Sequence, residues 1–407
     1  MKILLAHNFY GSGAPSGENI VYEAERDLLR ARGHHVIEFT RHSDHIRSRG
    51  VAGLLQGALA MPWNPFSASA LRRLILRERP EVMHAHNTFP LISPSVYSAA
   101  HGLGVPTVLT LHNYRIFCAA GIPLRDNLPC TECLDRQSTL PALRYGCYRG
   151  SRVATLPLAA MIGLHRSLGT WQRHVDAFIA LTAFQRDKLV AAGLPDRRVH
   201  LKPHFHPDPP PPLSWAEREH KVAYIGRLGP EKGLKSLIEA WRQWGADAPH
   251  LEIVGEGPER SVLEQAIAAA GLGGKIALLG QLSLASTQEH LARARLLALP
   301  SLCYEGFPMA IREALALGVP IAASNLGSIP CIVDDGRTGV LFKPGDERDL
   351  LRAVRALWSN AAGLERMSVA ARVEFDAKYT AERNFTSLME IYAAAMAQPR
   401  AGRLAIP

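Results

Sequence analysis

Residues 299–314 of the chain read LPSLCYEGFPMAIREA. The apolar run that ends at Leu299 predicts a short buried strand, and the apolar spacing from Met309 to Leu317 predicts a helix. Pro308 stands where such a helix takes its first residue, and Gly318 marks where it stops. The stretch therefore predicts a strand, a tight turn and a helix in direct succession.

Two glutamates frame this turn. Glu305 falls on the loop beyond the C-terminal end of the strand, and Glu313 falls just over one turn into the helix. Backbone N–H groups at the start of a helix have no partner within it, so they make a ready site for phosphate. We expect an anion-binding turn with an acid on each side.

Two similar junctions lie upstream. Residues 223–228 show a strand pattern, which is followed by Gly-Pro-Glu-Lys-Gly at 229–233 and by a helix from Leu234. Residues 251–258 again show a strand that ends in glycines before a helix. The ends of neighbouring parallel strands meet at one edge of a sheet, where ligands of such folds bind.

Together with Arg227 and Lys232, the Glu-x7-Glu box resembles the signature of the retaining family 4 glycosyltransferases, and the blocks stand in the same order. The resemblance implies that Arg227 and Lys232 neutralise the diphosphate of a nucleotide sugar. It also implies that Glu305 hydrogen-bonds hydroxyls of the donor sugar. Glu313 would hold the ribose hydroxyls of the nucleotide.

The resemblance also assigns the turn itself. The backbone of Gly306, Phe307 and Pro308 would line the sugar and the phosphates. A sugar that leaves a nucleoside diphosphate deposits negative charge on the phosphate, so fixed cations and backbone dipoles lower the barrier there. No carboxylate pair is needed as in glycosidases, and no cofactor is expected to be required for catalysis.

Two positions in the first half carry over from the family. Gly17 follows the first strand in a loop where the family usually has Gly-Gly and this chain has Ser16-Gly17; the resemblance implies a close backbone approach to the donor phosphate or the acceptor. A histidine at the place of His112 reaches the donor sugar in related transferases. The alternatives are a βα loop without a ligand and a structural histidine. His84 and His86 face one side of a strand, but the sequence shows no third metal ligand.

Four of the six cysteines lie in an insertion at residues 113–150: Cys118, Cys130, Cys133 and Cys147. The C-x2-C spacing with two further thiols could hold a structural zinc in a four-thiolate site. The alternative is a set of reduced thiols in a compact lid over the acceptor side. Arg125-Asp126-Asn127 between them predicts a hairpin turn.

Strand and helix patterns alternate in both halves of the chain, which indicates parallel sheets with helices on both faces. The resemblance implies the α/β fold called GT-B, in which two Rossmann-like, doubly wound parallel-sheet domains face a central cleft. We expect an acceptor-side domain at 1–205, a proline-rich linker at 206–220 and a nucleotide-sugar-binding domain at 221–380. A final helix within 381–407 is expected to cross back to the first domain.

The net charge is unevenly distributed. Residues 1–208 hold 24 Lys and Arg against 15 Asp and Glu, so the whole formal charge of +9 falls in this half. No motif for binding nucleic acid accompanies it, and we expect no nucleic-acid partner. The charge favours an anionic membrane surface or a lipid-diphosphate acceptor, with an ordinary solvated basic face as the alternative. No apolar run approaches the roughly 20 residues of a membrane span, so a cytoplasmic protein, peripheral at the inner face of the membrane, is expected.

These patterns predict a retaining glycosyltransferase that moves a hexose from a UDP- or GDP-sugar to a saccharide or lipid-linked acceptor. The natural context is exopolysaccharide, capsule or lipopolysaccharide-type assembly. A nucleotide-sugar epimerase on the same fold is one alternative, but its signature series differs. A catalytically inactive nucleotide-sugar-binding scaffold is another, and the intact Arg227, Lys232 and two glutamates argue against it.

Overall fold

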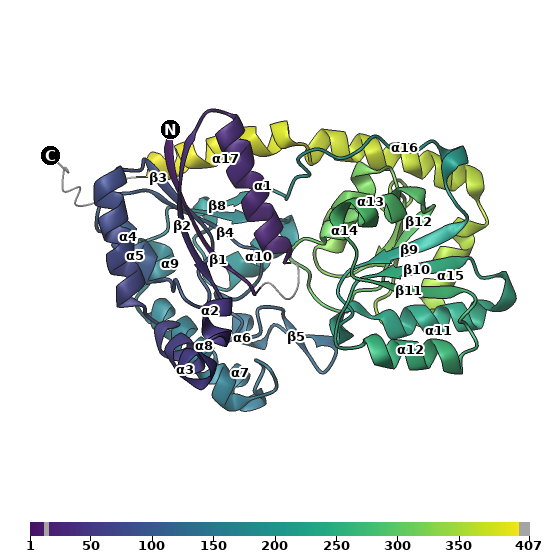
Figure 1. Ribbon diagram of the computed structural model, residues 1–407, viewed down its shortest axis with the longest axis horizontal. Coiled ribbons are helices and arrows are strands. Elements are labelled where there is room, and N and C mark those ends of the chain that lie inside the picture. Colours follow the sequence, from purple (N-terminus) through teal and green to yellow (C-terminus); the bar gives the residue numbers. More distant parts are fainter. Residues whose placement is uncertain (12–15, 399–407) are drawn as a thin grey trace. The chain divides into compact units, whose positions relative to one another are not determined.

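The computed structural model describes residues 1–11 and 16–398 (Figure 1). Contacts between residues divide the chain into two compact units. The first unit comprises Met1–Pro123, Thr131–Pro203 and the described residues from Asn384 onward. The second unit comprises Leu124–Cys130 and His204–Arg383. Each unit contains one six-stranded parallel sheet, as the alternating pattern predicts.

The sheet of the first unit has the order β2-β1-β3-β4-β7-β8. Its strands are β1 (Lys2–Phe9), β2 (His35–His42), β3 (Val82–Asn87), β4 (Thr107–Thr110), β7 (Ala177–Ala180) and β8 (Val199–Leu201). Its helices are α1 (Gly17–Ala31), α2 (Asp44–Arg47), α3 (Gly50–Ala60), α4 (Pro65–Glu78), α5 (Ser95–His101), α6 (Glu132–Asp135), α7 (Leu140–Tyr145), α8 (Arg152–Ser167), α9 (Thr170–Arg173) and α10 (Ala183–Ala191). Every residue of β3, β4 and β7 is buried, which explains why these strands lack the polar alternation of a half-exposed sheet.

The last helix, α17 (Ala381–Met396), completes the core of the first unit (Figure 1). Its Leu388 and Ile391 pack in one apolar cluster with Ile3 and Leu5 of β1. The hydroxyl of Tyr392 lies 2.8 Å from Nδ1 of His84 on β3. Most of this helix therefore belongs to the unit in which the chain begins.

The sheet of the second unit has the order β11-β10-β9-β12-β13-β14. Its strands are β9 (Lys221–Ile225), β10 (His250–Val254), β11 (Ile276–Gly280), β12 (Leu296–Leu299), β13 (Ile321–Ser324) and β14 (Gly339–Phe342). Its helices are α11 (Leu234–Trp244), α12 (Arg260–Ala269), α13 (Leu284–Arg293), α14 (Met309–Ala316), α15 (Glu347–Trp358) and α16 (Ala361–Lys378). Short 3-10 turns lie at Asp196–Arg198 in the first unit and at Trp215–Glu217, Pro230–Lys232, Gly245–Asp247 and Ile329–Cys331 in the second.

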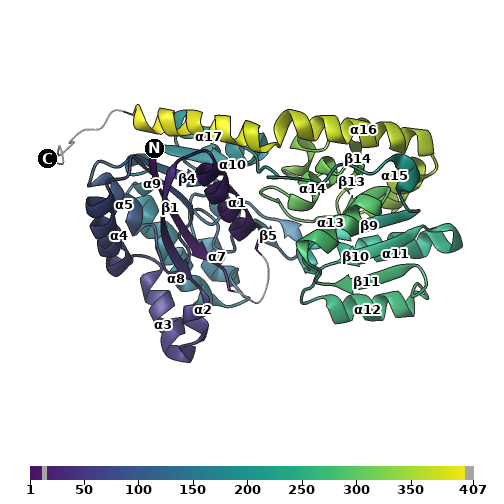
Figure 2. The same cartoon turned by 45° about the horizontal axis from the view of Figure 1, so that its top comes forward.

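Helices cover both faces of this second sheet. On one face α11 packs against α12 and α15, and on the other α14 packs against α13 and α16 (Figure 2). The strand order turns at β9 and β12, which pair with each other at the centre of the sheet. Loops that leave two such strands diverge to opposite faces and form the usual binding crevice of a doubly wound sheet.

Local expectations hold with one adjustment. The predicted hairpin forms: β5 (Leu124–Arg125) pairs with β6 (Leu128–Pro129) across Asp126 and Asn127, which both have positive φ as a type I′ turn requires. The cap of α14 differs from the expectation, since Pro308 is its N-cap and Met309 its first residue. Of the helices in the described ranges, none has both the length and the apolar character that crossing a membrane requires.

Glycines at the ends of β9 and β10 allow two backbones to approach closely. Gly226 has φ +155° and Gly255 has φ +138°. A Cβ added to Gly255 would lie 2.0 Å from the carbonyl oxygen of Gly226, while the N–H of Gly255 donates to the carbonyl of Gly280 at 2.8 Å. Neither the conformation nor the space suits a side chain.

We predict that Gly255→Ala lowers the free energy of unfolding by roughly 2–4 kcal/mol, because the new methyl group must displace backbone. Gly274→Ala is the matched control, since an added Cβ there meets nothing within 4 Å. Denaturant unfolding followed by circular dichroism measures both variants. Equal losses in the two would contradict the steric argument.

Candidate active site

Two loops of the second unit are fastened together at the centre of its sheet. The loop after β9 runs through Arg227 to Gly233, and the loop after β12 runs from Pro300 to Pro308. The N–H of Leu302 donates to the carbonyl of Glu231 at 2.8 Å. Gly233, at φ +69°, sits against Pro300 so closely that a Cβ would lie 2.0 Å from its carbonyl oxygen. These contacts fix the two loops side by side.

An ion pair joins the same loops through their side chains. Nζ of Lys232 lies 2.6 Å from Oε1 of Glu305, and the hydroxyl of Ser301 donates to that oxygen at 2.7 Å. Burial alone would raise the pKa of Glu305, but the Lys232 ammonium and the Ser301 hydroxyl outweigh it and lower that pKa. Burial likewise opposes the charge of Lys232, yet Glu305 raises its pKa above the usual value. Both groups are therefore charged, and the loop holds a fixed cation.

Arg227 is presented outward by a buried acid. Its Nη2 lies 2.5 Å from Oε1 of Glu231. The Arg227 side chain is 58% exposed, while that of Glu231 is 8% exposed. Gly229 passes so near the Glu231 carboxylate that any side chain there would clash with it. Glu231 thus anchors one edge of a guanidinium whose other donors are open to a ligand.

Glu313 lies in a different environment from Glu305. Burial raises the pKa of Glu313, and the neighbouring Arg312, whose Nη2 lies 3.3 Å from Oε1 of Glu313, only partly opposes this effect. Arg312 also donates to the carbonyl of Phe205, so its guanidinium is held in place. A buried acid of this kind is suited to hydrogen-bonding neutral hydroxyls. Glu313 and Arg312 are both buried, so Glu313 is not an ordinary surface acid.

The turn between the glutamates packs tightly. Phe307 is buried, with its ring 5.4 Å from that of His204 and 5.9 Å from that of Tyr379. Gly306 precedes this anchor, and Pro308 caps α14 in an extended conformation. The packing of Phe307 therefore fixes where α14 begins, and with it the direction of the first backbone N–H groups.

The first unit holds the remaining predicted residues. Gly17 is the first residue of α1, and part of the loop before it, residues 12–15, lies outside the described residues. The next residue, Glu18, accepts a hydrogen bond from Nδ2 of Asn113 at 2.6 Å. Asn19 lies 2.9 Å from Nε2 of His7. The start of α1 is thus tied to the loop that carries His112.

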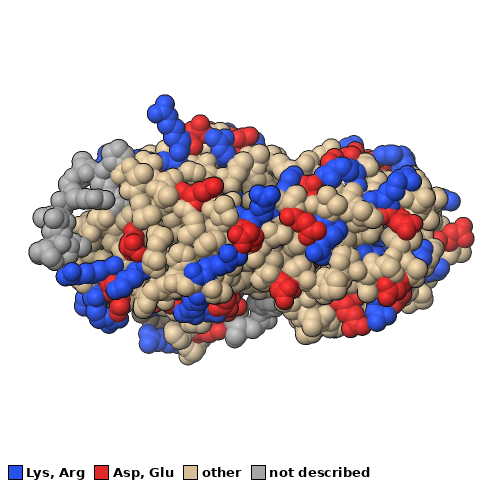
Figure 3. Space-filling model, turned by 90° about the horizontal axis from the view of Figure 1, so that it is seen from above, with Lys and Arg blue, Asp and Glu red and all other residues tan. Residues whose placement is uncertain are grey.

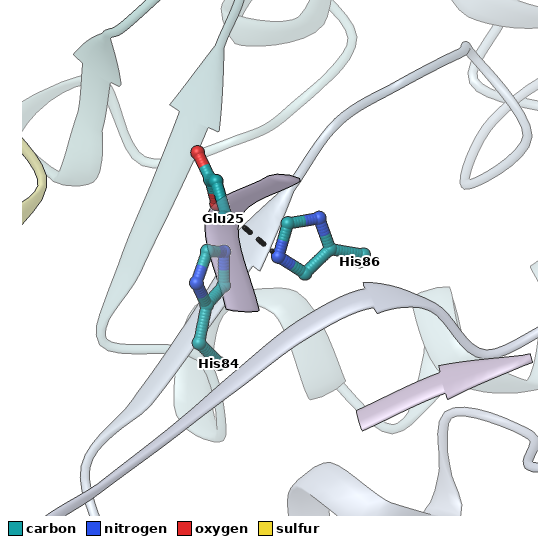
Figure 4. A group of neighbouring side chains, drawn as sticks. All are labelled: Glu25, His84 and His86. Atoms are coloured by element: carbon teal, nitrogen blue, oxygen red, sulfur yellow. Dashed lines mark ion pairs between the residues drawn. The ribbon is translucent and has the colours of Figure 1, made fainter. Parts of the chain in front are cut away.

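His112 lies at the end of a buried polar chain. Its Nε2 is 3.1 Å from Nδ1 of His86, and Nε2 of His86 is 3.3 Å from Oε2 of Glu25 (Figure 4). Glu25 is in turn paired with the ammonium of Lys202. The sequence pointed to His112 alone and gave no sign of Glu25, which comes from α1.

Glu25 also supplies the third metal ligand that the sequence did not show. Of the residues that the structure describes, Glu25, His84 and His86 form a group whose ligand atoms lie within 4.8 Å of one another. However, both ring nitrogens of His84 are engaged at 2.8 Å, one with Tyr392 and one with Thr110. Since Lys202 already supplies a cation to Glu25, the group fits a hydrogen-bonded network better than a metal ion.

The cysteine insertion holds four reduced thiols. All six cysteines are in the described ranges, and none forms a disulfide. No three of the four insertion thiols meet the 4.8 Å distance that the Glu25 group satisfies. Cys133 packs instead in an apolar cluster with Cys147 at its edge. Structural zinc stays a prediction that metal analysis tests: less than about half an equivalent, unaffected by Cys133→Ser, would end it.

Two family descriptions match the chain. That for Glycosyltransferase Family 4 matches residues 17–205, and that for Glycosyl transferases group 1 matches residues 209–374. Together these ranges take in most of the chain.

Named relatives agree with this match. Alpha-D-kanosaminyltransferase of Streptomyces kanamyceticus is 26% identical over 299 residues, 73% of this chain and 72% of that protein. The amylovoran biosynthesis glycosyltransferase AmsK of Erwinia amylovora is 26% identical over 226 residues, 53% of this chain and 56% of that protein. Among solved structures, Anabaena HepE in complex with UDP and glucose is similar with a TM-score of 0.67 and 18% identity, over 97% of this chain and 100% of that one.

Paired parallel-sheet units with this similarity have the GT-B fold, the fold of a large class of glycosyltransferases. The chain belongs to glycosyltransferase family 4 and is a glycosyltransferase, since both domains match and the relatives carry that activity in their names. The similarity to HepE, at 18% identity, establishes the fold alone.

Proposed function

We propose that the second unit binds a nucleoside diphosphate sugar and that the protein transfers the hexose, with retention of anomeric configuration, to a saccharide or lipid-linked acceptor. The observation that carries this proposal is the Lys232–Glu305 pair on the loop that leads into α14. It combines a fixed cation, an ionised carboxylate and a helix start within one fastened pair of loops. Those are the groups that a sugar diphosphate requires.

The pair suggests how each group works. When the diphosphate binds, the Lys232 ammonium can turn from Glu305 to a phosphate oxygen, and Arg227 can add its exposed donors. Glu305, released from Lys232, then accepts hydrogen bonds from hydroxyls of the sugar. As the glycosidic bond breaks, charge grows on the phosphate, and the two cations stabilise it more in the transition state than in the ground state.

The identity of donor and acceptor is the finer part of the proposal. HepE contains UDP, which favours uridine over guanosine as the base here. The name of AmsK, from amylovoran biosynthesis, favours an acceptor in polysaccharide assembly. A screen of UDP- and GDP-sugars against a lipid extract decides between transfer, epimerisation and binding alone. Release of nucleoside diphosphate only with acceptor supports transfer, and nuclear magnetic resonance of the product reports retention.

The first unit offers a surface that suits a membrane. Side chains of α3 that are more than half exposed are Val51, Leu54, Leu55 and Leu59, and Phe66 beside them is 84% exposed. The opposite side of α3 carries Gly53 and Gly57, which pack against Ile46 of α2. The helix itself has no charged side chain, so its exposed face is uncharged.

Arginines flank this apolar helix. Arg49 precedes it and contacts Gln56 through Nη1 at 2.9 Å, and Arg41 lines a shared hollow with Leu59 and Phe66. On the face shown in Figure 3, basic and acidic side chains are interspersed, so that face presents no surface of one sign. From the exposed apolar side chains of α3 and the arginines beside it, we propose that α3 docks on an anionic membrane. Its leucines would insert into the membrane, and the arginines would lie at the head groups.

Lys232→Ala is predicted to remove about 2–4 kcal/mol of transition-state stabilisation, because a charge that meets the leaving phosphate is lost. This loss lowers kcat/KM roughly 30- to 1,000-fold. Lys235→Ala is the matched control, since Lys235 pairs with Glu259 at 2.8 Å and is 61% exposed. Steady-state kinetics with the preferred donor measure both. An unchanged kcat/KM in Lys232→Ala would remove Lys232 from the site.

Glu313→Gln is predicted to raise the Kd for the free nucleoside diphosphate about 10- to 100-fold. This factor corresponds to the free energy of a hydrogen bond between a ribose hydroxyl and the buried carboxyl group. Titration calorimetry with UDP and GDP measures it. Glu365→Gln, on the exposed side of α16, should leave the Kd unchanged. Unaltered affinity in Glu313→Gln would refute the ribose role.

The double variant Leu55→Glu/Leu59→Glu should reduce binding to vesicles of phosphatidylcholine and phosphatidylglycerol at least tenfold. The two new carboxylates would have to enter the apolar layer, and the anionic head groups would repel them. The control is Val369→Glu/Val373→Glu, which changes two exposed valines of α16 in the second unit. Co-sedimentation measures both. Equal binding of the wild-type protein to neutral and anionic vesicles would contradict the proposal.

A further inference from the structure

A buried charge network in the first unit contacts His112 through His86. Figure 4 shows Glu25 and His86 of this network. Glu25 of α1 and Lys202, which directly follows β8, are each 1% exposed, and His86 of β3 is 3% exposed. Nδ2 of Asn384 also lies 3.4 Å from Oε1 of Glu25. Three groups from distant parts of the chain, Lys202, His86 and Asn384, thus converge on the carboxylate of Glu25.

The carboxylate of Glu25 is ionised. Burial would raise its pKa, but the attraction of Lys202 and the interaction with His86 outweigh burial and lower it well below the usual value. An ionised carboxylate only accepts hydrogen bonds. Nε2 of His86 lies 3.3 Å from Oε2 of Glu25, within ion-pair distance although the two atoms are not aligned as a hydrogen bond. A hydrogen on Nε2 is the arrangement that suits the neighbouring carboxylate.

This hydrogen determines the next contact. With a hydrogen on Nε2 alone, His86 has a lone pair on Nδ1, and Nδ1 then accepts. The atom that faces it at 3.1 Å is Nε2 of His112, which must then donate. The rings stack with centroids 5.3 Å apart, which holds the orientation. His112 consequently carries its proton on Nε2 and has Nδ1 as an acceptor.

We propose that Glu25 and His86 are positioning residues that set the tautomer and ring orientation of His112, with Lys202 keeping Glu25 charged. His112 and His86 line a small cavity of the first unit together with Asn113 and Arg115. The ring of His112 therefore borders a cavity that has other polar side chains in its lining. The inference rests on the proposed function together with the contact to the donor sugar that the family resemblance implies for His112. The tautomer itself does not depend on that function.

His84 provides a matched comparison. It lies on the same strand, is fully buried and has its ring 4.4 Å from that of His86. Its nitrogens engage Tyr392 and Thr110 rather than the line to His112. Replacing His84 therefore tests the cost of disturbing this core without breaking the chain from Glu25 to His112.

The variants are chosen to keep the protein folded. Glu25→Gln would leave Lys202 buried beside a neutral amide, a change that can unfold a protein. His86→Phe keeps the ring shape and leaves the Glu25–Lys202 pair intact. His84→Phe is the control, and circular dichroism with denaturant unfolding establishes that each variant is folded.

The first measurement does not use activity. In protein labelled with nitrogen-15 histidine, the resonances of His112, assigned by their absence from His112→Ala, should show the Nε2–H tautomer. His86→Phe should shift them to the pattern of mixed tautomers, and His84→Phe should leave them unchanged. An Nδ1–H tautomer of His112 in the wild-type protein, or no change in His86→Phe, would overturn the proposal even if transfer is never detected.

The second measurement is a double-variant cycle on transfer. His86→Phe should lower kcat at least tenfold with an unchanged Kd for the nucleoside diphosphate, and should have less than a twofold further effect in His112→Ala. An equal effect of His86→Phe in both backgrounds would make it merely structural and overturn the positioning role. Failure of the proposed function is separate, because it would appear as absence of transfer by the wild-type protein with every donor.

Discussion

The ion pair between Lys232 and Glu305 is the interaction on which the second unit's site depends. Removing two charges from water costs several kcal/mol per ion, and only close geometry with further hydrogen bonds offsets that cost. Ser301 supplies one such bond, and the backbone contact from Leu302 to Glu231 holds both loops in register. The pair therefore stores two charges in positions that a diphosphate and a sugar can take over.

The two acids of the box have separate chemistry although they look alike in the sequence. The pKa of Glu305 is lowered by Lys232, and the pKa of Glu313 is raised by burial. One is a charged acceptor beside a cation, and the other is a buried acid at the base of a helix. A raised and a lowered pKa would also suit the acid and the base of a hydrolase. The proposal of a shared role in holding one donor therefore rests on the cations Lys232 and Arg227 beside the turn.

Much of the fold could be predicted from the sequence, because buried parallel strands are short apolar runs that end in glycine or polar residues. The predicted strand that ends at Leu299 matches β12, which spans Leu296–Leu299. The strands β8 and β14 were missed, since Val-His-Leu and Gly-Val-Leu-Phe are too short to show a period. The cap of α14 was misplaced by one residue.

The site was predictable only where residues share a loop. Arg227 and Glu305 came from a resemblance. Their partners, Glu231 for Arg227 and Ser301 for Glu305, each lie four residues away and could have been suggested by proximity alone. Glu25 could not, because it is 61 residues from His86 and 177 from Lys202, and nothing local marks which face of α1 it occupies. Long-range polar contacts of this kind are set by topology rather than by pattern.

The position of α17 has a consequence for biosynthesis. Because Leu388, Ile391 and Tyr392 fill the core around β1, the second unit is in effect an insertion within the first. The ribosome delivers β1 before the second unit, yet the side chains that seal its core arrive only after most of the second unit has been translated. The core of the first unit therefore stays unfinished while the second unit is made, so of the two units the earlier one is completed later.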